Sequence, residues 1–108
     1  MPEIDIDPRD RILLLAIPDH EEVRAIAVRA REGIVVGLDS DEAVRAARKA
    51  LADLDNVMFV PQPDDGPFPW QDCFFSKVIA PQLAEVTTEM RRVLAPGGNV
   101  YLNNPQPQ

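Results

Sequence analysis

The stretch RILLLAIPDH at residues 11–20 decides the fold. Its residues 12–17 form a continuous apolar run, which is typical of a strand buried on both faces of a parallel sheet. Pro18 ends this run, and Asp19 with Glu22 three residues later matches a helix N-cap with a reciprocal acid. The sequence therefore predicts a central strand that leads directly into a helix.

The rest of the chain alternates between strand and helix patterns in the same way. Apolar residues at helical spacing predict three helices: Val23, Ile26, Ala27 and Ala30 in the first, Val44, Ala47, Leu51 and Leu54 in the second, and Leu83, Val86, Met90, Val93 and Leu94 in the third. Further strands are expected at residues 34–39, 56–60, 74–80 and 100–102. Strands separated by helices imply a parallel sheet with helices on both faces, a three-layer α/β/α sandwich.

A proline-rich segment interrupts this alternation. Residues 61–72 contain four prolines and a glycine, so they are expected to form a loop. Aromatic residues lie in and beside this loop: Phe68, Trp70, Phe74 and Phe75. They form either a stiff apolar contact surface or a lid that folds back over the sheet, and loops of this length usually pack their aromatics inward.

The composition is that of one acidic globular domain. The chain has 108 residues, of which 11 are basic and 18 acidic, and its formal net charge is -7. A surface of this charge repels a phosphate backbone, so nucleic-acid binding is not expected. The longest apolar run, residues 12–17, is far too short to cross a bilayer, so no membrane association is expected.

The cysteine count and the two ends of the sequence add to these expectations. Cys73 is the only cysteine, which excludes an internal disulfide and a multi-cysteine zinc site and fits a reducing, cytoplasmic compartment. Residues 1–10 hold four acids and no apolar core, unlike a signal peptide. We expect an N-terminal extension over residues 1–10, one domain over residues 11–103 and a polar tail over residues 104–108.

Three stretches together resemble class I S-adenosylmethionine-dependent methyltransferases. VVGLDSDEAVRAARKAL at residues 35–51 is similar to the family's second strand with its closing acid and the helix that follows. NVMFVPQPDDGPFPWQDCFFSKVIA at residues 56–80 resembles its third strand, proline loop and fourth strand. EMRRVLAPGGNVYL at residues 89–102 resembles the helix that ends in a Leu-x-Pro-Gly-Gly turn before the fifth strand. The resemblance implies a Rossmann-like sheet of five parallel strands in the order 3-2-1-4-5.

The resemblance also implies a cofactor site that this sequence only partly retains. The family has a glycine-rich turn after the first strand, so that bare backbone approaches the methionine part of the cofactor, but residues 16–20 contain no glycine. By the match, Asp39 is the ribose-binding acid, and Asp64 or Asp65 substitutes for the acid that contacts adenine. The alternative role for Asp39 is a helix N-cap paired with Glu42. The family adds two more strands after the fifth, so we expect a truncated protein with a degenerate cofactor motif.

Other chemistry and other folds have less support. His20 with its neighbouring acids suggests a metal or general-base site, but one helical turn does not converge them, so no metal is expected. Cys73 is expected to be a buried strand cysteine rather than a nucleophile. A response-regulator receiver domain needs an aspartate where Pro61 stands and a lysine where Asn103 stands. A dinucleotide-binding domain needs a glycine fingerprint after the first strand, which is absent.

Two functions remain open from the sequence. One is a methyltransferase-like protein without cofactor or catalytic activity that acts through protein contacts, and the other is an S-adenosylmethionine-dependent methyltransferase of unknown substrate. The edge strand at residues 100–102, extended by Leu83, Val86 and Met90 of the neighbouring helix, predicts a homodimer or a contact with a partner protein. A monomer whose edge is protected by Asn103, Asn104 and Pro105 is the alternative.

Overall fold

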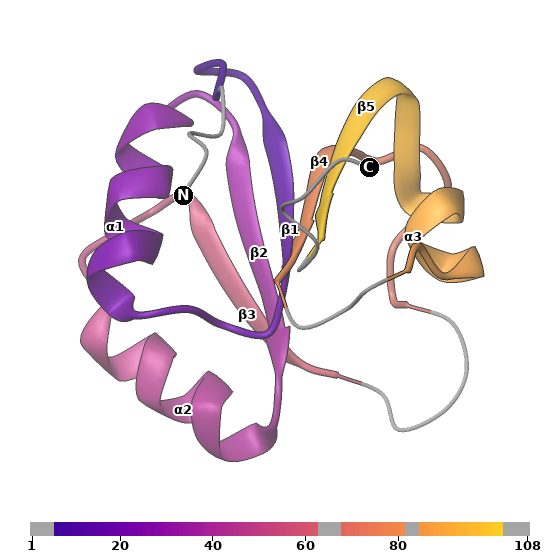
Figure 1. The fold of residues 1–108 in the computed structure, drawn as a ribbon. Coiled ribbons are helices and arrows are strands. Elements are labelled where there is room, and N and C mark those ends of the chain that lie inside the picture. Colours follow the sequence, from indigo (N-terminus) through magenta and orange to yellow (C-terminus); the bar gives the residue numbers. More distant parts are fainter. Residues whose placement is uncertain (1–5, 63–67, 82–84, 103–108) are drawn as a thin grey trace.

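The computed structural model of the chain describes residues 6–62, 68–81 and 85–102. It contains, in chain order, β1 (Arg11–Leu15), α1 (His20–Arg29), β2 (Ile34–Asp39), α2 (Asp41–Ala50), β3 (Val57–Pro61), β4 (Phe75–Ala80), α3 (Thr88–Val93) and β5 (Leu94–Leu102). The five strands form one sheet, and every pair of neighbouring strands is parallel (Figure 1). Their order is β3-β2-β1-β4-β5, which confirms the predicted architecture.

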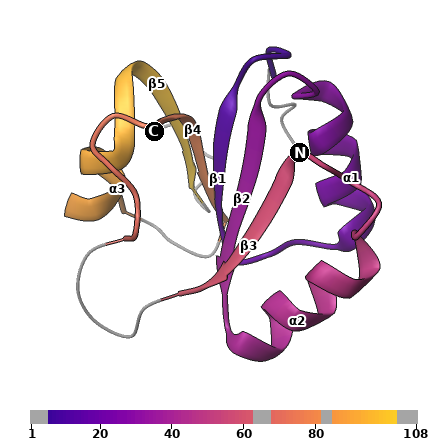
Figure 2. The ribbon, with the colours of Figure 1, turned by 180° about the vertical axis from the view of Figure 1, so that it is seen from behind.

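The helices cover the two faces of the sheet unequally. Helices α1 and α2 lie on one face, and the short α3 lies on the other (Figures 1 and 2). Side chains of successive strand residues point to opposite faces, so β1 sends Ile12 and Leu14 to one core and Leu13 and Leu15 to the other. All four are almost completely buried, as the apolar run predicts for a central parallel strand.

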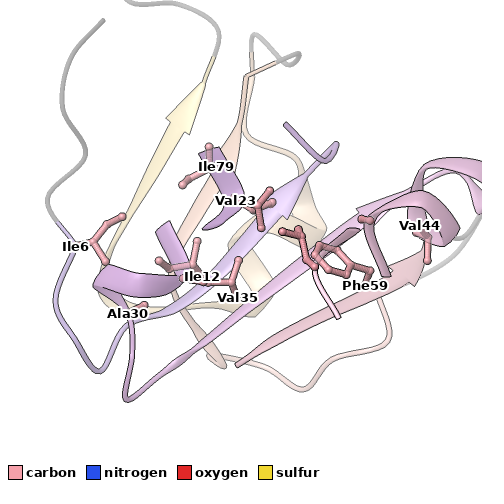
Figure 3. Close-up of a cluster of buried hydrophobic side chains, with 12 residues drawn as sticks. Ile6, Ile12, Val23, Ala30, Val35, Val44, Phe59 and Ile79 are labelled. Carbon is pink, nitrogen blue, oxygen red and sulfur yellow. The ribbon is translucent and has the colours of Figure 1, made fainter. Parts of the chain in front are cut away.

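Each core is built from the residues that the helical spacing singles out. Figure 3 shows the first core, between the sheet and helices α1 and α2. It includes Val23, Ala27 and Ala30 after β1, and Val44, Ala47 and Leu51 after β2. Burying a side chain of the size of valine or leucine stabilises the fold by about 1.5–3 kcal/mol. The predicted inward faces of the first two helices are confirmed.

The third helix and the fifth strand differ from the prediction. Helix α3 begins after Thr87, whose hydroxyl accepts a hydrogen bond from the Met90 N–H, and it already ends at Val93. Leu94 is extended and pairs with Phe75, so β5 starts there and not at residue 100. The predicted helix position Leu83 lies outside the described residues.

The Pro-Gly-Gly segment is an irregularity inside β5 and not the end of a helix. From the first pair with β4 to the next, β4 advances from residue 75 to 77 while β5 advances from 94 to 99. Gly97 has a φ of 81°, and a Cβ on Gly98 would lie 2.7 Å from the Ser76 carbonyl oxygen. Two glycines are therefore needed to bulge this strand while it stays on β4.

Residues 6–10 are packed against the domain at the amino-terminal edge of the sheet. The side chain of Asp10 is only 9% exposed and accepts hydrogen bonds from Lys77 Nζ at 2.6 Å and Ser76 Oγ at 2.8 Å. It also accepts one from the Asp7 N–H at 2.7 Å. Burial alone would raise the pKa of Asp10, but the bonds from Lys77, Asp7 and Ser76 together lower it below its usual range. This pair ties the N-terminal segment to β4.

We predict that Asp10→Asn lowers the free energy of unfolding by about 3 kcal/mol at neutral pH, because it leaves the Lys77 ammonium buried without its counter-ion. The stabilisation depends on an ionised Asp10, so it is present above the unfolded-state pKa of about 3.9 and is lost as the pH falls through the lower folded-state pKa. Urea denaturation at several pH values measures the difference, which should shrink in acid.

The matched control is Asp53→Asn, which removes the charge of Asp53 from its exposed pair with Arg24 of α1. Exposed ion pairs contribute little to stability, so Asp53→Asn should lower the free energy of unfolding much less than Asp10→Asn at neutral pH, and by a similarly small amount at every pH. Equal losses for the two variants would contradict a special role for the Asp10 pair.

Candidate functional site

A parallel sheet of this kind binds ligands at the carboxyl ends of its strands, beside the point where the strand order reverses, which here lies between β1 and β4. Asp39, the predicted ribose-binding acid, is the last residue of β2 and lies at this edge. The other two predicted cofactor residues, Asp64 and Asp65, lie outside the described residues. A role for Asp39 in cofactor binding stays a prediction, but its surroundings are defined.

The Asp39 carboxylate is used by the protein's own backbone. Its Oδ2 accepts a hydrogen bond from the Ile17 N–H at 2.8 Å, and its Oδ1 accepts one from the Ser40 N–H at 2.7 Å. The backbone oxygen of Asp39 accepts a third bond, from the Gln62 N–H at 2.8 Å. One residue therefore links the turn after β1, the end of β2 and the end of β3.

The turn after β1 offers few donors to a ligand. The Ala16 N–H donates to the Leu38 oxygen at 2.9 Å, the Ile17 N–H donates to Asp39, and Pro18 has no N–H. Ala16 has a φ of 83°, in the left-handed region that favours glycine. The turn thus keeps a glycine-like backbone, and the N–H groups of Ala16 and Ile17 donate to β2.

The aliphatic side chain of the turn packs on the sheet face that carries the first core. Ile17 packs against the first core, and its Cγ1 would lie 3.1 Å from a Cβ placed on Gly37 of β2. The Cδ1 atom of Phe59 would lie 2.9 Å from the same Cβ, so Ile17 and Phe59 meet over the bare backbone of Gly37. Gly37 is required because any side chain there would displace both neighbours.

The predicted N-cap role of Asp39 is wrong. Ser40 is the N-cap of α2, and its hydroxyl accepts a hydrogen bond from the Ala43 N–H at 3.2 Å. Asp39 is still in the strand, so its carboxylate turns toward β1 and does not cap the helix together with Glu42. Asp19 does occupy the N-cap of α1, but within the described residues its side chain makes no capping bond.

The aromatic residues of the described part of the loop pack inward. Phe75 is fully buried, and Phe68, Trp70 and Phe74 pack against the second core. Ring centroids lie 5.7 Å apart for Trp70 with Phe75 and 4.9 Å apart for Phe74 with Phe75. Of the two alternatives for this loop, the structure supports packing over the sheet.

An ion pair on α3 holds the loop in this position. Glu89 Oε1 accepts a hydrogen bond from the Phe68 N–H at 2.7 Å, and Arg92 Nη2 donates to the Phe68 oxygen at 3.0 Å. Arg92 also donates to Asp72 and to Glu89 itself. The hydrogen bonds from Arg92 and from the Phe68 N–H lower the pKa of Glu89. Sequence reasoning missed this clamp, which joins α3 to residues 20 or more positions earlier in the chain.

Cys73 and His20 are the remaining candidate residues. Cys73 is exposed with a φ of 58°, just before β4, so the prediction of a buried strand cysteine is wrong. Its N–H donates to the Arg92 backbone oxygen, and this bond stabilises the turn before β4.

His20 begins α1, and the described residues contain no group of three His, Cys, Asp or Glu side chains placed to hold a metal ion. No helix in the described part is long and apolar enough to cross a membrane.

Comparison with known proteins agrees with this architecture. No protein-family model matches the sequence, and no curated protein sequence matches it. Among solved structures, a SAM-dependent methyltransferase from Aquifex aeolicus matches with a TM-score of 0.69 and 17% identity, over 84% of this chain and 53% of that chain. The YcgJ protein from Bacillus subtilis matches with a TM-score of 0.70 and 18% identity, over 91% of this chain and 45% of that chain.

A third match comes from a protein assembly. A chain of the complex between the Haloferax volcanii Trm112 methyltransferase activator and a putative methyltransferase matches with a TM-score of 0.74 and 26% identity, over 90% of this chain and 46% of that chain. This chain therefore has a class I methyltransferase-like fold, and it spans about half the length of these structures. The resemblance seen in the sequence is confirmed at the level of the fold.

We predict that Ala16→Gly raises the free energy of unfolding by about 0.5–1 kcal/mol, because relief of the left-handed strain exceeds the added flexibility of the unfolded chain. Urea denaturation measures the change. The control is the same substitution in the middle of a helix: Ala46→Gly at an exposed position of α2 should lower stability by about 0.5–1 kcal/mol. Equal losses at both positions would contradict the geometry of this turn.

Proposed function

We propose that this protein is a methyltransferase-like protein without catalytic activity that acts through contacts with other proteins. The observation that carries the proposal is the hydrogen bond between the Asp39 carboxylate and the Ile17 N–H, with the Ile17 side chain packed above Gly37. The residue expected to bind ribose and the turn expected to approach the methionine part of a cofactor instead bind each other.

The donor set of the turn argues against a site for S-adenosylmethionine. A cofactor carboxylate needs N–H groups aimed at it, but those of Ala16 and Ile17 donate to β2 and Pro18 has none, so the next N–H groups are those of the first turn of α1. Glu21 and Glu22 lie in the first turn of α1, where negative charge opposes another anion. No catalytic step is therefore assigned to a bound cofactor.

The first test is titration with S-adenosylmethionine and with its demethylated product, followed by the melting temperature. A ligand at one hundred times its dissociation constant stabilises a fold by about 2.7 kcal/mol, so a working site would give a clear shift. We expect none at millimolar ligand.

The control separates a cofactor site from a general effect of the ligand. Asp39→Asn keeps one oxygen that can accept from the Ile17 N–H but removes the charge that would bind a ribose hydroxyl. A shift in the unaltered protein that disappears in Asp39→Asn would overturn the proposal and establish the alternative, an S-adenosylmethionine-dependent methyltransferase.

Protein contact is supported by the fold and by one of its structural neighbours. The Haloferax volcanii structure is a complex between a methyltransferase activator and a putative methyltransferase, so a domain of this architecture is found in a protein assembly. The proposed setting is the cytoplasm, which fits a chain whose single cysteine is exposed and not in a disulfide.

The contact we propose is a homodimer built on β5. This strand is the outer strand next to β4 in the described sheet, and Val100, Tyr101 and Leu102 are partly exposed. Outer strands carry main-chain groups that a second strand can pair with, and two-fold assembly is the commonest arrangement of identical chains.

We predict that the protein sediments at micromolar concentration with twice the mass of one chain and that Tyr101→Lys returns it to the mass of one chain. Val28→Lys is the matched control, because Val28 lies 60% exposed on α1, far from β5 in the fold. A single species with the mass of one chain, unchanged by Tyr101→Lys, would end the dimer hypothesis.

A further inference from the structure

The other outer strand of the sheet, β3, turns a defined set of main-chain groups away from β2. The Asn56 oxygen accepts from the Val35 N–H and the Gln62 N–H donates to the Asp39 oxygen, so even-numbered residues here face β2. Main-chain groups alternate in direction along a strand. The groups of Val57, Phe59 and Pro61 therefore point outward, at the edge where another strand would pair.

An arginine on α2 occupies the middle of this edge. Arg48 donates to the Phe59 oxygen from both Nε, at 3.1 Å, and Nη2, at 2.7 Å. The planar guanidinium thus covers the central outward acceptor of β3 with two donors, a stronger arrangement than one neutral hydrogen bond. A strand that paired with β3 would have to displace it.

The next outward-facing residue of β3, Pro61, prevents strand pairing in a different way. Pro61 is the last residue of β3, and it has no N–H to donate to a partner strand. Met58 of β3 is 47% exposed, and an exposed apolar side chain of this kind favours association of the edge with another strand. Edge strands that carry an apolar side chain and open main-chain groups are the usual sites of strand addition.

We propose that Arg48 is an edge guard, whose bond to the Phe59 oxygen keeps β3 from pairing with β3 of a second copy of this chain. When the guanidinium is absent, the strand available to pair with β3 in a solution of the pure protein is β3 of another copy of the chain. A two-fold pair of β3 strands then joins two sheets edge to edge. This edge lies at the other end of the sheet from β5, and its protection does not depend on the proposed function.

The test compares the sedimentation of Arg48→Met with that of the unaltered protein. Methionine keeps a long side chain and a high helix propensity but has no donor. We expect at least a doubling of the sedimenting mass relative to the unaltered protein, rising with concentration. The mass of the variant is compared with that of the unaltered protein, so an increase can be detected even if the unaltered protein already forms a dimer through β5.

Two further variants locate the association on β3. Arg45→Met removes the same charge from the same helix. Within the described residues Arg45 makes no hydrogen bond to β3, so the Arg45→Met protein should sediment with the mass of the unaltered protein. In Arg48→Met/Met58→Lys, the two-fold pair would bring lysines of both copies together, and the mass should return to that of the unaltered protein.

The outcome is decisive even if one variant is unstable. Circular dichroism establishes whether Arg48→Met is folded, and if it is not, Arg48→Lys, which has an ammonium in place of the planar fork, should show part of the mass increase. Folded Arg48 variants that sediment like the unaltered protein would overturn the proposal. Association that Met58→Lys does not reverse would also overturn it.

Discussion

The hydrogen bond from the Ile17 N–H to the Asp39 carboxylate is the contact on which the carboxyl edge of this sheet depends. The same residue accepts from the Gln62 N–H through its backbone oxygen, so the ends of three strands converge on it. A hydrogen bond to a charged group contributes about 1.5–3 kcal/mol, more than a neutral one. Asp39 therefore stabilises the region where related folds bind their ligand.

This bond contributes to the stability of the turn after β1 in a sheet of this fold. The turn after β1 needs a left-handed residue and some partner for its N–H groups, whether or not a cofactor is present. Ala16 meets the first requirement with strain, and Leu38 and Asp39 meet the second. The Ile17 side chain packs against the first core beside Gly37.

The parts of the structure that the sequence predicts well are those set by hydrophobic periodicity. The run at residues 12–17 identifies a strand buried on both faces, and the spacing from Val23 to Ala30 identifies the buried face of α1. Strand order came from the family resemblance, because periodicity does not distinguish one order of parallel strands from another.

The errors lie where a long-range contact competes with a local pattern. The Leu-x-Pro-Gly-Gly segment has the form of a helix end, but pairing with β4 extends the strand through it. Asp39 is in a good position for a cap, yet Ser40 takes that role because Asp39 pairs in register with Pro61 as part of β2. Arg48 and the Glu89–Arg92 clamp carry no local signal, since they bind backbone atoms of distant segments.

Amide hydrogen exchange at Ile17 tests the central claim most directly. The Ile17 amide should be protected in the unaltered protein, and Asp39→Ala should reduce that protection at least about tenfold. The neighbouring Ala16 amide, which donates to the Leu38 oxygen, should change much less and serves as the internal reference. An Ile17 amide that exchanges freely, or that becomes protected only when S-adenosylmethionine is added, would contradict this account.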